Sequence, residues 1–220
     1  MAQKSKGDSV IPDKLKSQLE FLLEADRMKS IYRQTYIIAD ESRGASMRDY
    51  EGETDTHRRR ENDAEHSFHL ALFVMMLAEY SNEPIDVLKT LKMVLIHDIV
   101  EIDAGDTYCY DAAGNMTKED REKAAADRLF GLLPPAQERE YRGLWEEFER
   151  TDTPESRFAA AVDRMQPMLL NYTKGGISWQ EHGAGYEQVY DRNKHIGDGS
   201  DTLWEYMSGL LENAREKGMI

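Results

Sequence analysis

Residues 93–106 of this chain read MVLIHDIVEIDAGD. The apolar run of a predicted helix leads directly into the adjacent pair His97 and Asp98. Burying a histidine beside an aspartate on such a face costs free energy unless both side chains find partners. If the pair stood alone, the better explanation would be a hydrogen-bonded core histidine next to an aspartate that caps a helix or pairs with arginine.

The composition of the chain limits its partners. Hydrophobic residues make up 40% and charged residues 32% of the 220 residues, as in soluble globular proteins of one domain. The formal net charge of −14 should repel nucleic acid and anionic membranes, so neither is expected as a partner. A small phosphorylated substrate is compatible with this charge if a cation or an arginine supplies local positive charge.

The sequence also predicts a cytoplasmic location. Its single cysteine, Cys109, excludes an intrachain disulfide, which suits a reducing compartment. The N-terminus has no apolar signal core, and the longest apolar stretch, residues 70–78, is far shorter than a membrane span.

The chain reads as one helix after another, which predicts an all-α, single-domain bundle over residues 13–220 behind an N-terminal tail, residues 1–12. No strand is expected. The expected helices cover residues 12–33, 62–78, 84–101, 117–133, 134–150, 153–174, 186–193 and 200–217, with residues 177–220 as a C-terminal helical extension and residues 179–185 as a loop. The side of the second helix expected to face the core carries Phe68, Ala71, Leu72, Met75 and Ala78.

Residues 40–60 interrupt the helical pattern. This segment is polar, contains two glycines and has no periodicity, so we expect a long flexible loop. Its Arg58-Arg59-Arg60 run is most simply a solvated charge run.

Two further residues make the His97-Asp98 pair more informative. His66 lies on the preceding predicted helix, and Asp163 follows an apolar run on a later one. Two imidazoles and two carboxylates suit a divalent cation of borderline preference, and helical bundles often build metal sites from facing helices. Because the residues come from distant segments, spacing alone leaves the metal and non-metal interpretations equally open.

This ordered set resembles the HD-domain superfamily of metal-dependent phosphohydrolases, whose pattern is a histidine, a His-Asp pair on the next helix, and a distant aspartate. The stretches ENDAEHS (61–67) and HDIVEIDAGD (97–106) are most similar to the branch of the 5′-deoxynucleotidases, which remove phosphate from deoxyribonucleoside monophosphates. The resemblance covers about residues 15–175 apart from the loop. It implies an HD-type helical bundle in which His66, His97, Asp98 and Asp163 hold one divalent ion (Mn, Co, Fe, Zn or Mg).

The resemblance also implies roles around the metal. Glu101 lies four residues after His97 and would be the general acid or base beside a metal-activated water. Arg33, at the end of the first predicted helix, would grip the phosphate, and Asp106 would contact a sugar hydroxyl. The 5′-deoxynucleotidases carry a tryptophan beside this arginine, whereas this chain has Gln34-Thr35-Tyr36, so the base and sugar of the substrate stay open.

Alternatives remain within the same scaffold. They are a hydrolase of another phosphate bond (a pyrophosphate or a cyclic diester), a di-iron oxygenase, and a non-catalytic nucleotide-binding regulator. No histidine lies between Asp98 and Asp163, which favours a single metal, with His69 supporting His66 or packing in the core. Related proteins are often dimers, so a homodimer is expected.

Overall fold

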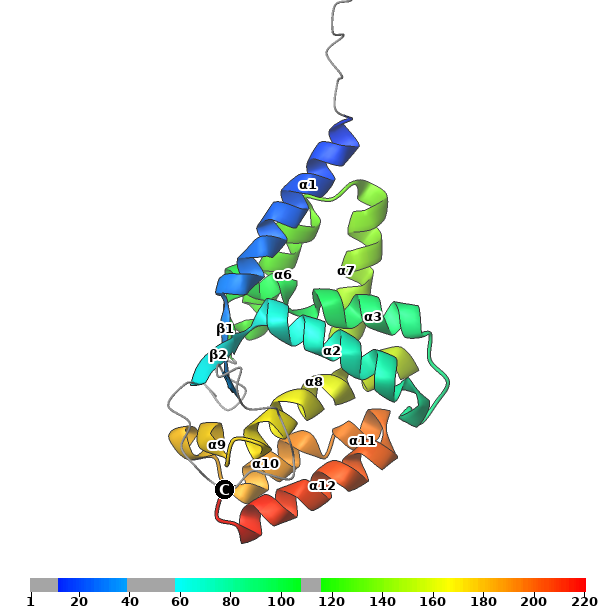
Figure 1. Cartoon of the computed structure of the whole chain (residues 1–220). Coiled ribbons are helices and arrows are strands. Elements are labelled where there is room, and N and C mark those ends of the chain that lie inside the picture. Colours follow the sequence, from blue (N-terminus) through cyan, green and yellow to red (C-terminus); the bar gives the residue numbers. More distant parts are fainter. Residues whose placement is uncertain (1–11, 39–57, 108–115) are drawn as a thin grey trace, which may run out of the picture.

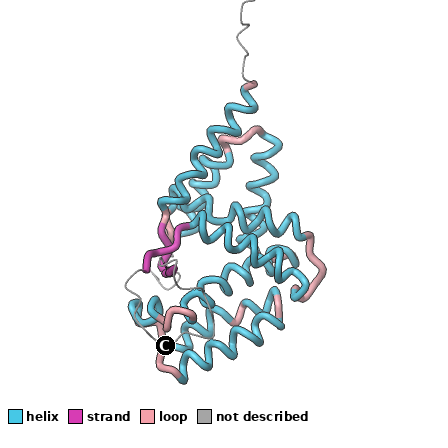
Figure 2. Tube along the Cα trace, viewed as in Figure 1, coloured by secondary structure: helices cyan, strands magenta, loops and turns pink. Residues whose placement is uncertain are grey.

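The computed structural model describes residues 12–38, 58–107 and 116–220, which form helices and one small sheet (Figures 1 and 2). The predicted all-α class is therefore confirmed. The predicted tail 1–12, apart from Pro12, lies outside the described residues, as do Cys109 and residues 40–57 of the predicted loop. None of the described helices has both the length and the apolar character needed to cross a membrane.

The first part of the chain supplies the elements that carry most of the site. They are α1 (Asp13–Ala25), the 3₁₀ turn Asp26–Ser30, β1 (Tyr32–Ile38), β2 (Arg58–Asn62), α2 (Asp63–Leu77), the 3₁₀ turn Ala78–Tyr80, α3 (Val87–Ile96), the 3₁₀ turn His97–Val100 and α4 (Glu101–Ala104). The second part covers them with α6 (Lys118–Phe130), α7 (Pro135–Arg150), α8 (Pro154–Tyr172), α9 (Ile177–His182), α10 (Tyr186–Asn193), α11 (Ile196–Gly199) and α12 (Asp201–Glu216).

A two-stranded sheet corrects the prediction for Arg33. The first helix ends at Ala25 rather than near Arg33, and Arg33 lies on β1. This strand pairs antiparallel with β2, in a register that sets Tyr32 opposite Asn62. The β-branched and aromatic residues at 35–38 favour extended backbone, and residues 36–38 pair with residues 58–60 of the partner strand. The expectation of no strand is therefore wrong, as is the loop prediction for residues 58–60.

The helix that leads into the His-Asp pair also ends earlier than predicted. Asp86 caps α3 by accepting a hydrogen bond from the Lys89 amide at 3.1 Å, and the α-helix stops at Ile96. His97 and Asp98 lie in the following 3₁₀ turn, which continues into α4. Gly105, with φ +76°, then ends the segment in a conformation that favours glycine.

Helix α2 turns a different side inward from the one expected. Asn62 and Glu65 form a capping box at its start. The buried residues are Asp63, His66, Ser67, Leu70, Phe73 and Val74, whereas Phe68, Leu72 and Met75 are exposed. The expected core-facing side is therefore wrong. Helix α2 carries apolar side chains on most of its faces, so the apolar pattern does not fix which face points inward. The hydrogen-bonding and ionic partners of its polar residues decide that orientation.

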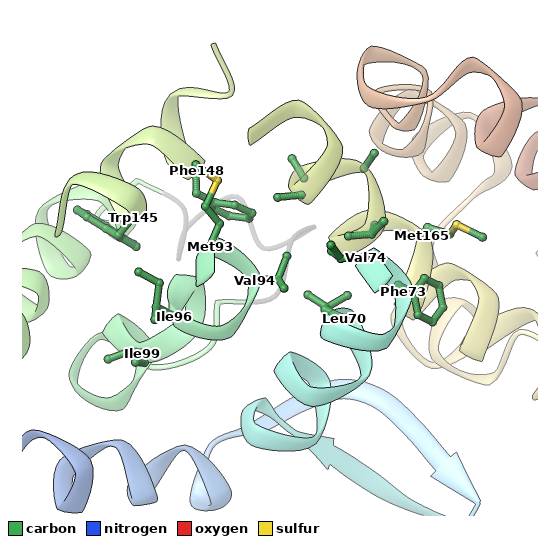
Figure 3. Packing of buried hydrophobic residues seen from close by; sticks show 14 of the residues in the cluster. Leu70, Phe73, Val74, Met93, Val94, Ile96, Ile99, Trp145, Phe148 and Met165 are labelled. Carbon is green, nitrogen blue, oxygen red and sulfur yellow. The ribbon is translucent and has the colours of Figure 1, made fainter. Parts of the chain in front are cut away.

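The core around the site is formed by α2, α3, α7 and α8. Figure 3 shows Val94 of α3 facing Leu70 and Val74 of α2, and Met93 of α3 beside Phe148 of α7. Each fully buried side chain of this kind stabilises the fold by about 1.5–3 kcal/mol. The helices that carry the candidate site are thus fixed by apolar packing directly beside it.

The C-terminal helices pack against α8 (Figure 1). A Cβ atom at Gly199 would lie only 2.4 Å from the Arg157 carbonyl oxygen, so glycine permits this close approach of α11 to α8. The predicted extension over residues 177–220 is helical, but residues 179–182 belong to α9 rather than to a loop.

Candidate metal centre

His66 is fully buried on α2, and both of its ring nitrogens have partners. Its Nδ1 lies 3.1 Å from Oε1 of Gln166, and its Nε2 lies 3.0 Å from Oδ1 of Asp163. Because the amide oxygen can only accept, Nδ1 carries a proton and Nε2 is the nitrogen that faces the site. The amide of Gln166 in turn donates to Glu61 at 2.6 Å.

His97 is held in a matching way by the 3₁₀ turn. Its Nδ1 donates to the Val94 carbonyl oxygen at 3.0 Å, which leaves Nε2 free to act as a ligand. This Nε2 is buried and makes no hydrogen bond, although it lies 3.1 Å from Asp98 Oδ1 and 3.5 Å from Asp163 Oδ1. The carboxylates therefore surround the nitrogen at angles unsuited to a hydrogen bond.

The four predicted ligands lie together. One ligand atom each of His66, His97 and Asp98 falls within 4.8 Å of the others. Asp163, from α8, places the same Oδ1 atom within 3.5 Å of both imidazoles. Three separate segments thus supply two imidazoles and two carboxylates to one buried point, and this donor set fits a divalent cation of borderline preference.

The charges of these groups stabilise one another. Burial would lower the pKa of His97, but the Asp98 and Asp163 carboxylates raise it well above its ordinary value. Burial raises the pKa of Asp163, yet its hydrogen bond with His66 and the nearby imidazole of His97 hold it well below the usual range. The carboxylates of Asp98 and Asp163 are therefore ionised and stabilise positive charge on the two imidazoles. A bound metal cation would supply that positive charge in place of the imidazole protons.

Arg33 reaches the centre from β1. Its guanidinium donates to Asp98 Oδ2 at 2.7 Å and lies 3.5 Å from Asp63 Oδ1, while its Nε is buried without a partner. The structure therefore brings Arg33 to the predicted site, although from a strand rather than from a helix.

Glu101 lies beside the same group on α4. Its side chain is 6% exposed, and its Oε2 is buried with no hydrogen bond. Burial, followed by the charge of Asp98, raises its pKa well above the ordinary value. One oxygen each of Asp63, Asp98 and Glu101 lies within 4.8 Å of the others, so Glu101 directly adjoins the candidate ligands.

Sequence reasoning missed Asp63 and Gln166. Asn62 caps α2, and Asp63, the next residue, is fully buried against Arg33. Burial and the neighbouring Asp98 raise the pKa of Asp63 to about 7. Gln166 follows Asp163 by three residues, a spacing that places both on one face of a helix and that could have indicated it. It also contacts Nδ1 of His69 at 3.2 Å.

Three of the candidate ligands, His97, Asp98 and Asp163, line an open cavity of ≈ 160 Å³. Asp106 lines it, as predicted for a residue near substrate, and so do Gln34 and Thr35 of β1. The cavity also holds residues that the sequence did not indicate, namely Lys118, Glu122, Glu149, Arg164, Trp179, Arg192 and Asn193. An aromatic residue is therefore present, but α9 supplies it rather than the segment next to Arg33.

Comparison with known proteins identifies the family. A family model described as HD domain matches residues 51–204, well over half of the chain. The chain belongs to the HD-domain family. Its His-Asp pair, with His66 before it and Asp163 after it, is the set that the sequence pattern indicated for this family.

Two solved structures resemble this HD-domain protein. One, from Magnetospirillum magnetotacticum and named as a predicted metal-dependent phosphohydrolase, is 43% identical with a TM-score of 0.82, covering 94% of this chain and 96% of that one. The PH0347 protein of Pyrococcus horikoshii is 19% identical with a TM-score of 0.57, over 90% of this chain and 99% of that one, and shares the fold.

Curated relatives are more distant. The 5′-deoxynucleotidase HDDC2 of Xenopus laevis is 25% identical over 154 residues, which are 70% of this chain and 67% of the relative. That of Danio rerio is 26% identical over 109 residues, which are 50% of this chain and 53% of the relative. The match thus spans about half the length of the fish protein.

Proposed function

We propose that this HD-domain protein is a metal-dependent phosphomonoesterase that acts on nucleoside 5′-monophosphates, as a 5′-deoxynucleotidase does. One observation carries the proposal: His97, Asp98 and Asp163 line a cavity that also holds Arg33 and Glu101, and the buried His66 contacts Asp163 at 3.0 Å. The names of the similar proteins, a metal-dependent phosphohydrolase and several 5′-deoxynucleotidases, support the same activity.

His66, His97, Asp98 and Asp163 would hold one divalent cation, which could be manganese, cobalt, iron, zinc or magnesium. When bound, such a cation acts as a Lewis acid that acidifies a coordinated water and offsets charge on the phosphate. The protein contributes orientation, because Gln166 and the Val94 carbonyl fix the two imidazoles with Nε2 towards the site.

Arg33 would position the phosphate. A guanidinium has five N–H donors, and Nη1 of Arg33 contacts both Asp98, at 2.7 Å, and Asp63, at 3.5 Å. These two carboxylates hold the guanidinium at the cavity that Arg33 lines. The remaining donors form a planar array that matches phosphate oxygens.

Glu101 would move the proton. Hydrolysis adds water to phosphorus, breaks the ester P–O bond and delivers a proton to the departing alcohol. Oε2 of Glu101 is buried, unpartnered and next to Asp98, so it can hold that proton and release it to the reacting oxygens. Asp106, which lines the cavity, would accept a hydrogen bond from a sugar hydroxyl.

The described residues favour one metal over two. The second acidic group, Asp63 with Asp98 and Glu101, contains no histidine, and Arg33 already supplies a positive charge to it. A di-iron oxygenase is therefore less well supported than a hydrolase. Product analysis separates the remaining alternatives, because a pyrophosphatase or cyclic diesterase releases a nucleotide, and a regulator binds without turnover.

We also propose that the protein acts in the cytoplasm as a homodimer, without a nucleic-acid or membrane partner. Exposed apolar side chains occur on each of α1, α2 and α3, among them Leu22 (61%), Phe68 (65%), Met76 (63%) and Leu88 (64%). A second copy of the chain would cover such side chains.

A screen of nucleoside monophosphates across several divalent metals, measured as released phosphate, tests the proposed activity. Glu101→Gln should retain the metal and lose turnover, while Glu187→Gln, an exposed glutamate on α10, should behave like the wild type. Absence of phosphate release from every monoester by the metal-loaded wild type would rule the proposal out.

A further inference from the structure

The cavity contains two arginines that the proposed chemistry does not use. Arg164 lies on α8, immediately after Asp163, and Arg192 lies near the end of α10. Both line the same cavity as the candidate metal ligands. Because consecutive Cα atoms are about 3.8 Å apart, Arg164 lies within the length of one small substrate from the metal centre.

Neither arginine has an anionic partner within the described parts of the chain. The hydrogen bond of Arg164 goes to the Ala160 carbonyl oxygen at 3.0 Å, and no ion pair involves Arg164 or Arg192 there. The other two cations of the cavity are matched, since Arg33 contacts Asp98 at 2.7 Å and Lys118 lies 3.4 Å from Glu122. The cavity thus contains two guanidinium groups that can bind an anion.

Carboxylates act on Arg164 without forming an ion pair with it in the described residues. Burial lowers the pKa of Arg164, Asp163 opposes this shift, and the charge of Arg192 lowers the pKa further, while Asp198 and Glu149 raise it. The cavity lining includes uncharged side chains, namely Asn171, Ser178, Trp179 and Asn193, as well as carboxylates such as Glu149. Two like charges in a partly enclosed space repel each other, and an anion between them converts that repulsion into two attractions.

We propose that Arg164 and Arg192 bind a second phosphate of the substrate, so that the preferred substrate is a doubly phosphorylated molecule such as a nucleoside 3′,5′-bisphosphate. The inference rests on the proposed phosphatase function and specifies its substrate class. Water cleaves the ester at the metal centre and releases one phosphate, while the second phosphate stays on the product and only anchors it. Arginine suits this task because its planar donors match phosphate oxygens.

The test compares a deoxynucleoside 3′,5′-bisphosphate with the matching 5′-monophosphate. We expect the metal-loaded wild type to favour the bisphosphate by about tenfold in kcat/KM, as one or more charge-assisted hydrogen bonds would give. Arg164→Gln and Arg192→Gln should each bring this ratio close to one. Arg192 is exposed, so its variant should fold even if the Arg164 variant does not.

Arg157→Gln is the matched control. Arg157 lies on the same helix, pairs with Glu83, and does not line the cavity but a second pocket, which it shares with Arg164, His195 and Asp198. Its variant should keep the wild-type ratio. An equal loss in this variant would place the anion in the surface pocket and overturn the assignment to the cavity.

A binding measurement separates failure of this inference from failure of the proposed function. Calorimetry on metal-loaded Glu101→Gln protein should show about tenfold tighter binding of the bisphosphate than of the monophosphate, whether or not the wild type turns either over. Equal binding of the two would overturn the second phosphate subsite. If the wild type hydrolyses the monophosphate and the ratio of the two kcat/KM values is near one, the second phosphate subsite is also overturned. The phosphatase proposal would then stay intact.

Discussion

The side-chain amide of Gln166 links a candidate ligand to a buried hydrogen-bond network. Its Oε1 accepts from Nδ1 of His66 at 3.1 Å, and its Nε2 donates to Glu61 at 2.6 Å. Gln166 is fully buried, so no water can replace these bonds without rearrangement of the core. Gln166→Leu keeps a side chain of similar size and removes both polar groups.

Two effects of Gln166→Leu can be sized from these contacts. Nδ1 of His66 and a carboxylate oxygen of Glu61 lose partners in the interior, at about 1–3 kcal/mol each, so the free energy of unfolding should fall by roughly 2–6 kcal/mol. Loss of the group that orients a metal-binding histidine typically weakens metal binding about 10–100-fold, or about 1.4–2.8 kcal/mol.

Urea unfolding of the metal-free protein and calorimetric titration with manganese measure the two effects separately. Gln188→Leu, an exposed glutamine on α10, is the control and should change neither quantity appreciably. If folded Gln166→Leu protein binds manganese within about twofold of the wild type, the argument that Gln166 orients His66 as a ligand is refuted.

Three further predictions follow from other parts of the structure. Phe68→Asp, which places a charge on the exposed face of α2, should convert the proposed dimer to a monomer in light scattering, and an unchanged mass would exclude this face as the interface. Thr151→Gly should raise the free energy of unfolding by about 1 kcal/mol, because Thr151 holds φ at +49°; no increase in urea unfolding would contradict this. Removing the metal with a chelator should lower the Tm by about 5–10 °C if the metal was present near 100 times its Kd, whereas His97→Ala should show no such change in the same thermal scan.

Residue type and order were enough to indicate most of the candidate site. His66, His97, Asp98 and Asp163 are polar interruptions of apolar helical faces, and such interruptions need partners when buried. The structure places them together and sets Glu101 beside them. Their roles as ligands and as the proton carrier stay predictions that the experiments above address.

Long-range pairing explains what the sequence did not reveal. Arg33 reaches the site because β1 pairs with β2, a partner that the helical spacing of residues 15–32 does not indicate. Helix α2 is apolar around most of its circumference, so the pattern could not choose between Phe68 and Leu70 as the inward side chain. The deciding contacts, such as His66 with Gln166, join segments far apart in sequence.

Release of phosphate as a function of bound metal tests the central proposal most directly. Metal-free protein is titrated with manganese in the presence of a deoxynucleoside 5′-monophosphate or its 3′,5′-bisphosphate, and the rate is plotted against metal bound per chain. A single site formed by His66, His97, Asp98 and Asp163 predicts a linear rise that levels off at one metal per chain. A plateau at two metals per chain, or no phosphate release with either substrate at any loading, would contradict it.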